Sequence, residues 1–147
     1  MIQILSSSDA LKNIPLASAS ADNDAVRHAS APRILVVDDE ALIADTIVQI
    51  LNRNGFIAEA AYSGEQAIEY AKRHCPELVL SDVLMPHIDG VEAAIQISQH
   101  CPDTRIVLFS GQAATLEILS RAKERGYTFE LLPKPIHPTQ LIQHLRS

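Results

Sequence analysis

The chain has 147 residues, a length typical of one domain, and a formal net charge of −6, which argues against a protein that wraps a nucleic-acid backbone. No apolar run approaches the roughly 20 residues of a membrane span, and the N-terminus lacks the basic and apolar regions of a secretory signal. Its two cysteines, without such a signal, fit a reducing compartment. We therefore expect a cytoplasmic protein with no membrane segment and no direct nucleic-acid partner.

Residues 1–32 differ in composition from the rest of the chain. They are rich in Ala, Ser, Asp and Asn and show no sustained hydrophobic period. Such a segment buries too little apolar surface to fold on its own. We interpret it as a flexible N-terminal tail and assign residues 33–147 to a single globular domain.

From residue 33 onward, five short apolar runs alternate with five segments of helical period. RILVV, LVL and RIVLF are continuous, which is typical of strands buried on both faces, whereas FIAEA and TFELL contain a polar residue, as edge strands do. Ser63 with Gln66 forms a capping box, and Gly55 and Pro138 suit a helix end and a helix start. The predicted strands cover residues 33–37, 56–60, 78–80, 105–109 and 128–132, and the predicted helices cover residues 41–54, 64–74, 90–100, 113–125 and 138–146.

This alternation predicts the fold class. Strands separated by helices form a parallel sheet that is covered by helices on both faces. With the second and fifth strands at the edges, we expect an α/β fold with a doubly wound five-stranded sheet in the order 2-1-3-4-5.

A short motif occurs twice where a predicted helix ends and a strand follows, as RHCPE at residues 73–77 and QHCPD at residues 99–103. The predicted strand order makes the two following strands neighbours, on the sheet edge opposite the strand carboxyl ends. A metal site of two Cys and two His, or a disulfide, is compatible with this arrangement. The simpler interpretation, which we favour, is that Cys75 and Cys101 are small buried apolar side chains and that the prolines end the helices.

Ligands of open α/β sheets bind beyond the carboxyl ends of the strands. Each residue at these ends has an ordinary explanation, as a helix cap, a turn former or a solvated charge. Together, clustered carboxylates would repel one another, which a divalent cation relieves; hard oxygen ligands suit Mg²⁺, and a lysine balances the charge. The residues at these ends are Asp38, Asp39 and Glu40 after the first strand, Asp82 after the third, Ser110 after the fourth and Lys134 after the fifth.

Four segments resemble, in order and spacing, the receiver domain of two-component response regulators: ILVVDDE, LVLSDVLMPHIDG, VLFSG and LLPKP. The resemblance extends from Arg33 to the C-terminus. It implies a flavodoxin-like receiver fold and a bacterial, single-domain, CheY-like signalling protein. It also implies that the phosphoryl donor is a sensor histidine kinase or a histidine phosphotransfer protein.

The resemblance assigns a role to each matching residue of the site. Asp82 would accept the phosphoryl group and form an acyl phosphate. Lys134 would pair with one phosphoryl oxygen, and Ser110 would form a hydrogen bond with another. Phosphoryl transfer depends mainly on positioning and charge neutralisation, which fits this set of side chains.

The resemblance also implies a Mg²⁺ site, and the residue at position 84 predicts how fast the phosphoryl group is lost. Asp39 and Asp82 would bind the ion directly, Asp38 mainly through water, and the backbone carbonyl of Leu84 would complete the protein ligands. A leucine side chain cannot orient a water molecule for hydrolysis, although Gln112 could do so. We therefore expect slow self-dephosphorylation.

Two loop features are also expected from the sequence. Gly90 should permit a tight turn before the third helix. The lysine–proline step of the family, here Lys134–Pro135, is often a cis peptide.

The fifth strand departs from the family pattern. The family usually has an aromatic switch residue three positions before the lysine, where this chain has Leu131. Phe129 lies on the same side of the strand and could replace it only if the strand shifts. Gly126 is one residue further from the lysine than usual, which allows a bulge, and Pro133 is tolerable on an edge strand.

The sequence ends after the fifth predicted helix, so we expect a stand-alone receiver that acts by phosphorylation-dependent protein binding or as a relay. It would be a monomer or a weak phosphorylation-dependent dimer with a target that the sequence does not identify. The family usually binds targets through its fourth and fifth helices and fifth strand, where Arg121, Lys123, Arg125 and Tyr127 lie. A solvated helix face explains these basic residues more simply.

Two other functions are weighed against this one. A receiver-like binding module that is never phosphorylated is favoured only by Leu131. A Mg²⁺-dependent phosphohydrolase of the haloacid-dehalogenase type needs a DxDx[TV] motif, and VVDDEAL lacks that spacing. We therefore expect no enzyme activity beyond the chain's own phosphorylation and slow self-dephosphorylation.

Overall fold

The computed structural model describes residues 31–111 and 115–147, and within them five strands alternate with five helices. The strands are β1 (Arg33–Val37), β2 (Ile57–Ala61), β3 (Leu78–Asp82), β4 (Arg105–Ser110) and β5 (Glu130–Pro133). The helices are α3 (Ala41–Asn52), α4 (Gly64–Arg73), α5 (Gly90–His100), α6 (Thr115–Glu124) and α7 (Pro138–Arg146). Residues 1–30 of the tail predicted over residues 1–32 lie outside the described residues, so the tail stays a prediction.

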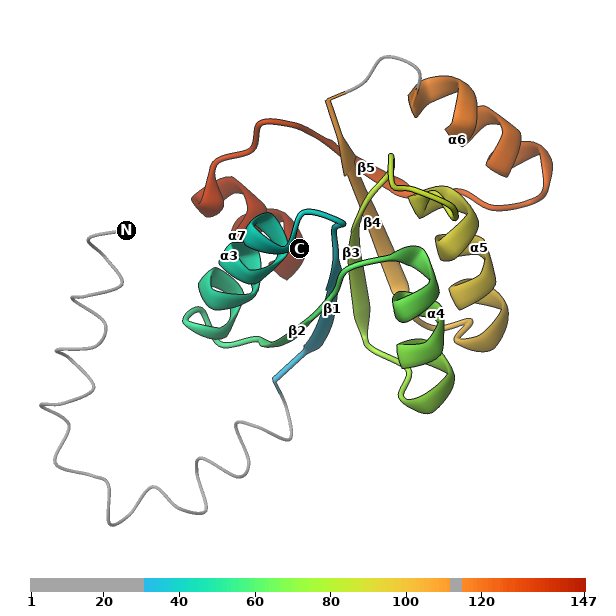
Figure 1. Cartoon of the computed structure of the whole chain (residues 1–147). Coiled ribbons are helices and arrows are strands. Elements are labelled where there is room, and N and C mark those ends of the chain that lie inside the picture. Colours follow the sequence, from blue (N-terminus) through green and yellow to red (C-terminus); the bar gives the residue numbers. More distant parts are fainter. Residues whose placement is uncertain (1–30, 112–114) are drawn as a thin grey trace, which may run out of the picture. The chain divides into compact units, whose positions relative to one another are not determined.

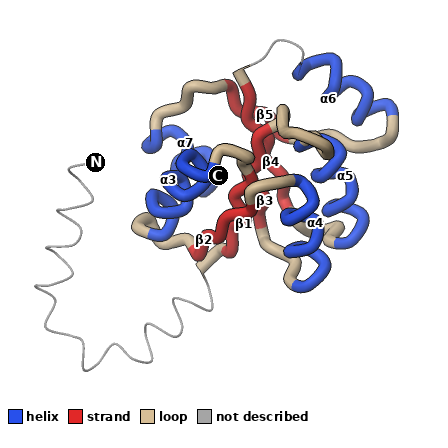
Figure 2. Tube along the Cα trace, viewed as in Figure 1, coloured by secondary structure: helices blue, strands red, loops and turns tan. Residues whose placement is uncertain are grey.

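The five strands form one parallel sheet in the order β2-β1-β3-β4-β5, which confirms the predicted doubly wound fold. Helices α3 and α7 cover one face of the sheet, and α4, α5 and α6 cover the other (Figures 1 and 2). Among the described helices, none is long and apolar enough to cross a membrane.

Two apolar cores, one on each face of the sheet, hold the helices in place. Strand residues alternate between them because successive side chains point to opposite faces. Val36 and Val107 contribute to the core beneath α3 and α7, whereas Leu35 and Leu108 contribute to the core beneath the other three helices. The central strands are therefore apolar on both faces, as their continuous sequences predict.

The predicted helix starts are confirmed where the sequence signals were specific. The Ser63 side chain accepts a hydrogen bond from the Gln66 N–H at 3.0 Å, and Gln66 Oε1 accepts one from the Tyr62 N–H at 2.9 Å. Asp89 caps α5 by accepting a hydrogen bond from the Glu92 N–H at 2.8 Å. Pro138 occupies the first turn of α7.

The last strand begins later than predicted, at Glu130 instead of Thr128. Its pairing with β4 runs without interruption from Glu130 opposite Val107 to Pro133 opposite Ser110. The bulge that we considered is therefore absent from this pair of strands. The additional residue lies in the connection that follows Gly126, whose φ of +91° ends α6 in the left-handed region that glycine tolerates.

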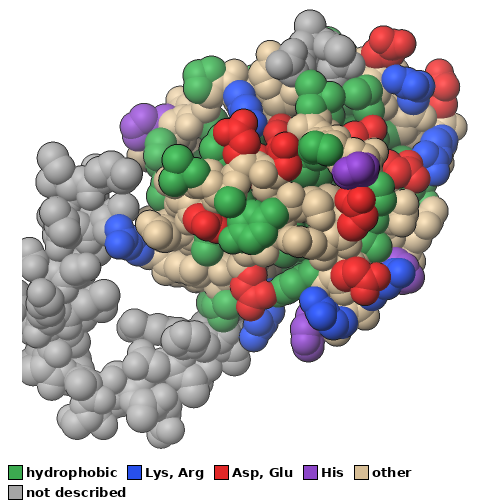
Figure 3. Space-filling view, in the orientation of Figure 1, with side chains coloured by type: hydrophobic (Ala, Val, Ile, Leu, Met, Phe, Trp, Pro, Cys, Tyr) green, Lys and Arg blue, Asp and Glu red, His purple; other side chains and the backbone are tan. Residues whose placement is uncertain are grey.

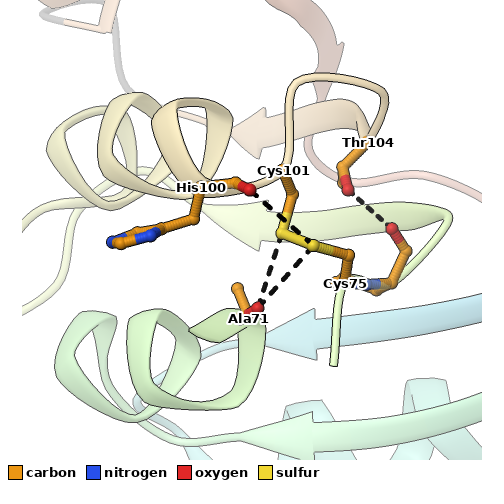
Figure 4. The surroundings of a disulfide bond; sticks show 6 residues. Ala71, Cys75, His100, Cys101 and Thr104 are labelled. Carbon is orange, nitrogen blue, oxygen red and sulfur yellow. Dashed lines mark hydrogen bonds between the residues drawn. A yellow bond between two sulfur atoms is a disulfide. The ribbon is translucent and has the colours of Figure 1, made fainter. Parts of the chain in front are cut away.

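The interpretation of the two cysteines as separate apolar side chains is wrong. Cys75 and Cys101 form a disulfide that joins the segments at the ends of α4 and α5, with their Cα atoms 5.6 Å apart (Figure 4). The parallel pairing of β3 with β4 brings the two motifs together. Local sequence does not predict this contact, because it joins segments that are far apart in the chain. The His100 ring points away from the sulfurs (Figure 4), and the His74 ring contacts Tyr70, so the four residues do not form a metal site.

Candidate functional site

The candidate site lies at the carboxyl ends of β1 and β3, where the order of the strands reverses. Asp38 directly follows β1, and Asp82 is the last residue of β3. Both strands are buried, so the sheet fixes the backbone from which these side chains project. In the space-filling view, acidic side chains gather beside a basic one near the top of the described surface (Figure 3).

Three carboxylates meet there. Asp38, Asp39 and Asp82 each offer an oxygen, and these oxygens lie within 4.8 Å of one another. The Asp38 side chain is 1% exposed, and its Oδ2 has no hydrogen-bond partner among the described residues. An unsatisfied buried carboxylate oxygen beside two further carboxylates is a donor set that fits a hard divalent cation. The cluster can therefore hold a metal ion.

The environment of Asp38 is unfavourable for its charged form. Burial raises its pKa above the ordinary value, and the nearby charges of Asp82 and Asp39 raise it further. The Glu40 N–H, which donates a hydrogen bond to Asp38 Oδ1 at 2.9 Å, and the Lys134 ammonium lower the pKa in part. A cation bound at this cluster would remove the cause of the repulsion.

Lys134 supplies the positive charge of the site from the end of β5. Its Nζ lies 3.4 Å from Asp82 Oδ1 and 3.9 Å from Asp38 Oδ2. The ammonium also lies 4.6 Å from the centre of the Phe109 ring, a contact that our sequence analysis missed. Phe109 precedes Ser110 on the neighbouring strand and belongs to the VLFSG segment that the sequence analysis singled out. The segment alone does not indicate the contact with Lys134, because the contact depends on the register between β4 and β5.

Backbone contacts hold the end of β5 against β4. The Lys134 N–H donates a hydrogen bond to the Ser110 carbonyl at 3.1 Å, and Pro133 lies opposite Ser110. Because β5 is an edge strand, the missing N–H of Pro133 costs no partner in the sheet. The Lys134–Pro135 peptide bond is cis.

The other two predicted site residues lie on the same edge of the sheet. Ser110 is the last residue of β4 and is 7% exposed. Leu84 lies two residues beyond Asp82, with its side chain exposed. Gln112, considered as a residue that orients water, lies outside the described residues.

The loop after Asp82 is compact at Gly90, the residue that we expected to permit a tight turn. Gly90 does not have a positive φ; instead, a Cβ at this position would overlap the carbonyl oxygen of Asp82. The Gly90 N–H donates a hydrogen bond to the Val83 carbonyl at 2.7 Å. Close approach of two backbones, not a special turn angle, is therefore what this glycine permits.

Phe129 does not take the place of the family's aromatic switch residue. It precedes β5 and stacks on Tyr127 with a centroid separation of 6.2 Å, while Leu131 is paired with Leu108 in the regular register. The strand has not shifted, so the condition under which Phe129 could substitute is not met. Leu131 therefore occupies the position that is usually aromatic.

The residues considered for target binding do not form a uniform basic surface. Arg121 and Lys123 are exposed, but Arg125 pairs with Glu92 at 3.0 Å. Tyr127 is half-buried, and its hydroxyl oxygen accepts a hydrogen bond from Gln99 Nε2 at 3.4 Å. The arrangement is consistent with the solvated helix face that the sequence favoured.

The fold and this acidic site define a class of protein. Its members have a doubly wound sheet with a carboxylate cluster and a lysine at the point where the strand order reverses. A sequence profile of the response regulator receiver domain matches residues 34–146. The chain is 36% identical over 118 residues to the chemotaxis protein CheY of Bacillus subtilis, which covers 80% of this chain and 97% of CheY. It is 34% identical to the transcriptional regulatory protein PdtaR of Mycobacterium tuberculosis, but it matches only 53% of that protein.

Solved structures agree with the sequence matches. A CheY-like receiver domain protein from Methanospirillum hungatei superposes with a TM-score of 0.72 at 25% identity, covering 80% of this chain and 92% of that one. The receiver domain of NtrX from Brucella abortus superposes with a TM-score of 0.67 at 29% identity, covering 77% of this chain and 94% of that one. The chain belongs to the response regulator receiver domain family, as its sequence motifs predict.

Proposed function

We propose that this receiver accepts a phosphoryl group on Asp82 from a histidine kinase or a histidine phosphotransfer protein. One observation carries the proposal. The Asp82 carboxylate ends a buried strand within a cluster of three carboxylates, and the Lys134 ammonium lies 3.4 Å from its Oδ1. This arrangement keeps a nucleophilic carboxylate next to a positive charge that can neutralise an incoming phosphoryl group.

The reaction follows from these positions. An Asp82 oxygen attacks the phosphorus atom, the bond from phosphorus to the donor histidine nitrogen breaks, and an acyl phosphate forms. Lys134 pairs with a phosphoryl oxygen, and Ser110 hydrogen-bonds another. Asp39, Asp82 and the Leu84 carbonyl would hold Mg²⁺ directly, and Asp38 through water. When bound, the ion neutralises charge on the phosphoryl oxygens.

Phosphorylation then changes which protein this receiver binds, or the group passes to another histidine in a relay. The extensive match to CheY, a chain of about the same length as the matched region, supports a function carried by the receiver domain itself. Leu131 occupies the usual aromatic position, so the change at the target surface must proceed without an aromatic switch there. Binding of a downstream target protein, a cytoplasmic location, and a monomeric or weakly dimeric state stay predictions.

Incubation with acetyl phosphate and Mg²⁺, followed by intact mass measurement, tests the proposal. We expect one phosphate-sized adduct on the wild-type chain and none on Asp82→Asn. Asp103→Asn is the matched control, because Asp103 is exposed and lies in the loop before β4, at the opposite edge of the sheet. An unmodified wild-type chain, or equal modification of Asp82→Asn, would contradict the assignment.

The lifetime of the acyl phosphate is a separate prediction. The exposed Leu84 side chain has no polar atom with which to orient an attacking water. We expect the adduct to persist well beyond seconds at room temperature without a phosphatase. Leu84→Asn or Leu84→Glu should shorten this lifetime. A wild-type adduct that disappears within seconds would show that another group orients the water.

A further inference from the structure

The disulfide lies at the edge of the sheet opposite the acidic site. Helices α4 and α5 begin near the acceptor loop, where a Cβ on Gly64 would crowd Ile88 and one on Gly90 would overlap the backbone of Asp82. Both helices then run down the same face of the sheet, and Cys75 and Cys101 join the segments at their far ends (Figures 1 and 4). The bond thus ties together two helices that start beside Asp82 and the loop that follows it.

The two cysteines differ in access to solvent. Cys75 is exposed, whereas Cys101 is only 2% exposed and belongs to the apolar core beneath α4, α5 and α6. A thiol that attacks this disulfide from solvent therefore reaches Cys75 first. Access of the attacking thiol is one of the factors that determine which sulfur of a disulfide reacts.

The surroundings of the sulfurs also suit the reduced form. Cys101 Sγ lies 3.4 Å from the Ala71 carbonyl oxygen, and Cys75 Sγ lies 3.8 Å from the same oxygen and 3.9 Å from that of His100 (Figure 4). A thiol can donate a hydrogen bond to these acceptors, whereas a thiolate would be repelled by them and by the negative ends of both helices. The opened pair is therefore accommodated as two neutral thiols.

Other contacts hold this edge of the sheet without the disulfide. Thr104 Oγ1 donates a hydrogen bond to the Pro76 carbonyl at 2.6 Å. The Arg105 N–H donates to the Glu77 carbonyl at 3.0 Å, and the Glu77 N–H donates to the Arg33 carbonyl at 3.0 Å. The first two bonds join the same two segments as the disulfide, and the third joins one of them to β1, so opening the disulfide leaves the strands paired.

We propose that Cys75–Cys101 is a reversible thiol–disulfide exchange site, opened by small thiols at Cys75, whose redox state sets how tightly the ends of α4 and α5 are held. In the first step, a thiolate attacks Cys75 Sγ, the Cys75–Cys101 bond breaks, and Cys101 leaves as a thiolate that takes a proton. A second small thiol, as its thiolate, then releases Cys75, which is protonated in turn. In balance, two small thiols become one small disulfide, and the protein gains two thiols.

Exchange with glutathione tests the site and the order of attack. Folded wild-type protein treated with reduced glutathione and then alkylated should gain two alkyl groups, with an unchanged circular dichroism spectrum. In the single-cysteine variants, oxidised glutathione should modify Cys101→Ser, which retains the exposed Cys75, at least about tenfold faster than Cys75→Ser. Equal rates, the opposite order, or reduction that occurs only in denaturant would overturn the proposal.

Hydrogen exchange tests the effect on the helices. The Cys101 N–H bonds to the Ile97 carbonyl at 2.7 Å, and the His74 N–H bonds to the Tyr70 carbonyl at 2.9 Å, so both report on the last helical turns. We expect these amides to exchange faster in the reduced protein, while the amides of β3 stay unchanged. Identical protection in the two redox states would show that the bond does not restrain α4 and α5. Both tests use protein without acetyl phosphate, so they are independent of phosphoryl acceptance.

Discussion

Asp38 is the buried member of the acidic cluster, and its carboxylate is held where a charge is unfavourable. Its folded-state pKa is raised, chiefly by burial and then by the charge of Asp82. The folded protein therefore binds more protons than the unfolded chain near the ordinary pKa of Asp, so stability falls as pH rises through that range. The residue that bears this cost has an oxygen, Oδ2, without a hydrogen-bond partner among the described residues, and this oxygen can bind a cation.

We predict that Asp38→Asn stabilises the metal-free protein at pH 7 by roughly 1 kcal/mol, within the range usual when an unfavourable functional residue is replaced. Asparagine retains an oxygen that can accept the Glu40 N–H, but it carries no charge. Urea unfolding in the presence of a chelator measures the effect. The advantage should vanish in saturating Mg²⁺ and at acid pH, where Asp38 is protonated.

Asp39→Asn is the matched control for this variant, because Asp39 lies in the same cluster but is exposed. It should stabilise the protein less than Asp38→Asn. Destabilisation by Asp38→Asn in the absence of metal would mean that the carboxylate has a favourable partner and is not a strained ligand.

Gly90 shows a second constraint at the scale of one residue. A methyl group there would overlap the Asp82 carbonyl oxygen, which belongs to the backbone and cannot rotate away. We predict that Gly90→Ala lowers the free energy of unfolding by about 1–3 kcal/mol, as overpacking does, and slows phosphorylation of Asp82. Thermal unfolding and the acetyl phosphate assay measure the two effects.

Gly111→Ala is the comparison for Gly90→Ala. A Cβ at Gly111 would lie 3.6 Å from the Lys134 Cβ, an ordinary van der Waals contact. This variant should unfold at nearly the wild-type temperature. Equal losses in both variants would mean that chain flexibility, and not steric overlap, explains the requirement for glycine.

At the scale of elements, one group of charges attaches the last helix to the sheet. Arg105 of β4 binds both carboxylate oxygens of Glu130 of β5, at 2.6 and 2.7 Å. His144 of α7 lies 3.1 Å from the same carboxylate, and the Arg105 guanidinium donates to the carbonyls of His144 and Leu145 at 3.3 Å. Two strands and the C-terminal end of α7 therefore share one ion-paired cluster.

We predict that Glu130→Gln lowers the free energy of unfolding by roughly 1 kcal/mol at pH 7, a modest value because the side chains are partly exposed. The hydrogen bonds from Arg105, followed by the charge of Arg105 and the contact with His144, lower the pKa of Glu130 below its ordinary value. Its contribution is therefore complete above that ordinary value and disappears as pH falls through the lowered one. Urea unfolding across this acid range measures the difference.

The Arg125–Glu92 pair supplies the control for that variant, since both of its side chains are well exposed. Glu92→Gln should change stability by only a few tenths of a kcal/mol. If Glu130→Gln has no larger effect than Glu92→Gln, the cluster does not hold α7 to the sheet.

At the scale of the whole molecule, the disulfide closes a loop between two cysteines that are 26 positions apart in the sequence. Restricting the unfolded chain over such a loop is worth about 3.5 kcal/mol in the chain-entropy description. We predict that reduction lowers the free energy of unfolding by about this amount and leaves a folded domain. Urea unfolding with and without reductant measures it.

Cys75→Ser provides the control for reduction. Its stability should equal that of the reduced wild-type protein within about 1 kcal/mol, and added reductant should not change it. The contrary outcome is an unfolding midpoint of the wild-type protein that stays the same in reductant although both thiols become free. It would show that the unfolded chain gains no conformational freedom when the bond opens.

Much of the molecule was predictable from local sequence because each signal acts over a few residues. The apolar runs RILVV and RIVLF predicted buried strands, and Ser63 and Pro138 predicted where helices start. The doubly wound order, in turn, placed Asp38, Asp82, Ser110 and Lys134 on one edge of the sheet, because parallel strands have their carboxyl ends on the same side. The motifs then indicated the receiver family.

Tertiary structure decided the features that depend on how distant segments meet. The contact of Lys134 with the Phe109 ring follows from the register of β4 and β5, and the requirement at Gly90 follows from the approach of α5 to the end of β3. The bond between Cys75 and Cys101 needs the pairing of β3 with β4, which brings together residues that the sequence separates by 26 positions. Sequence determined which chemical groups lie at each edge of the sheet, whereas packing determined which of them touch.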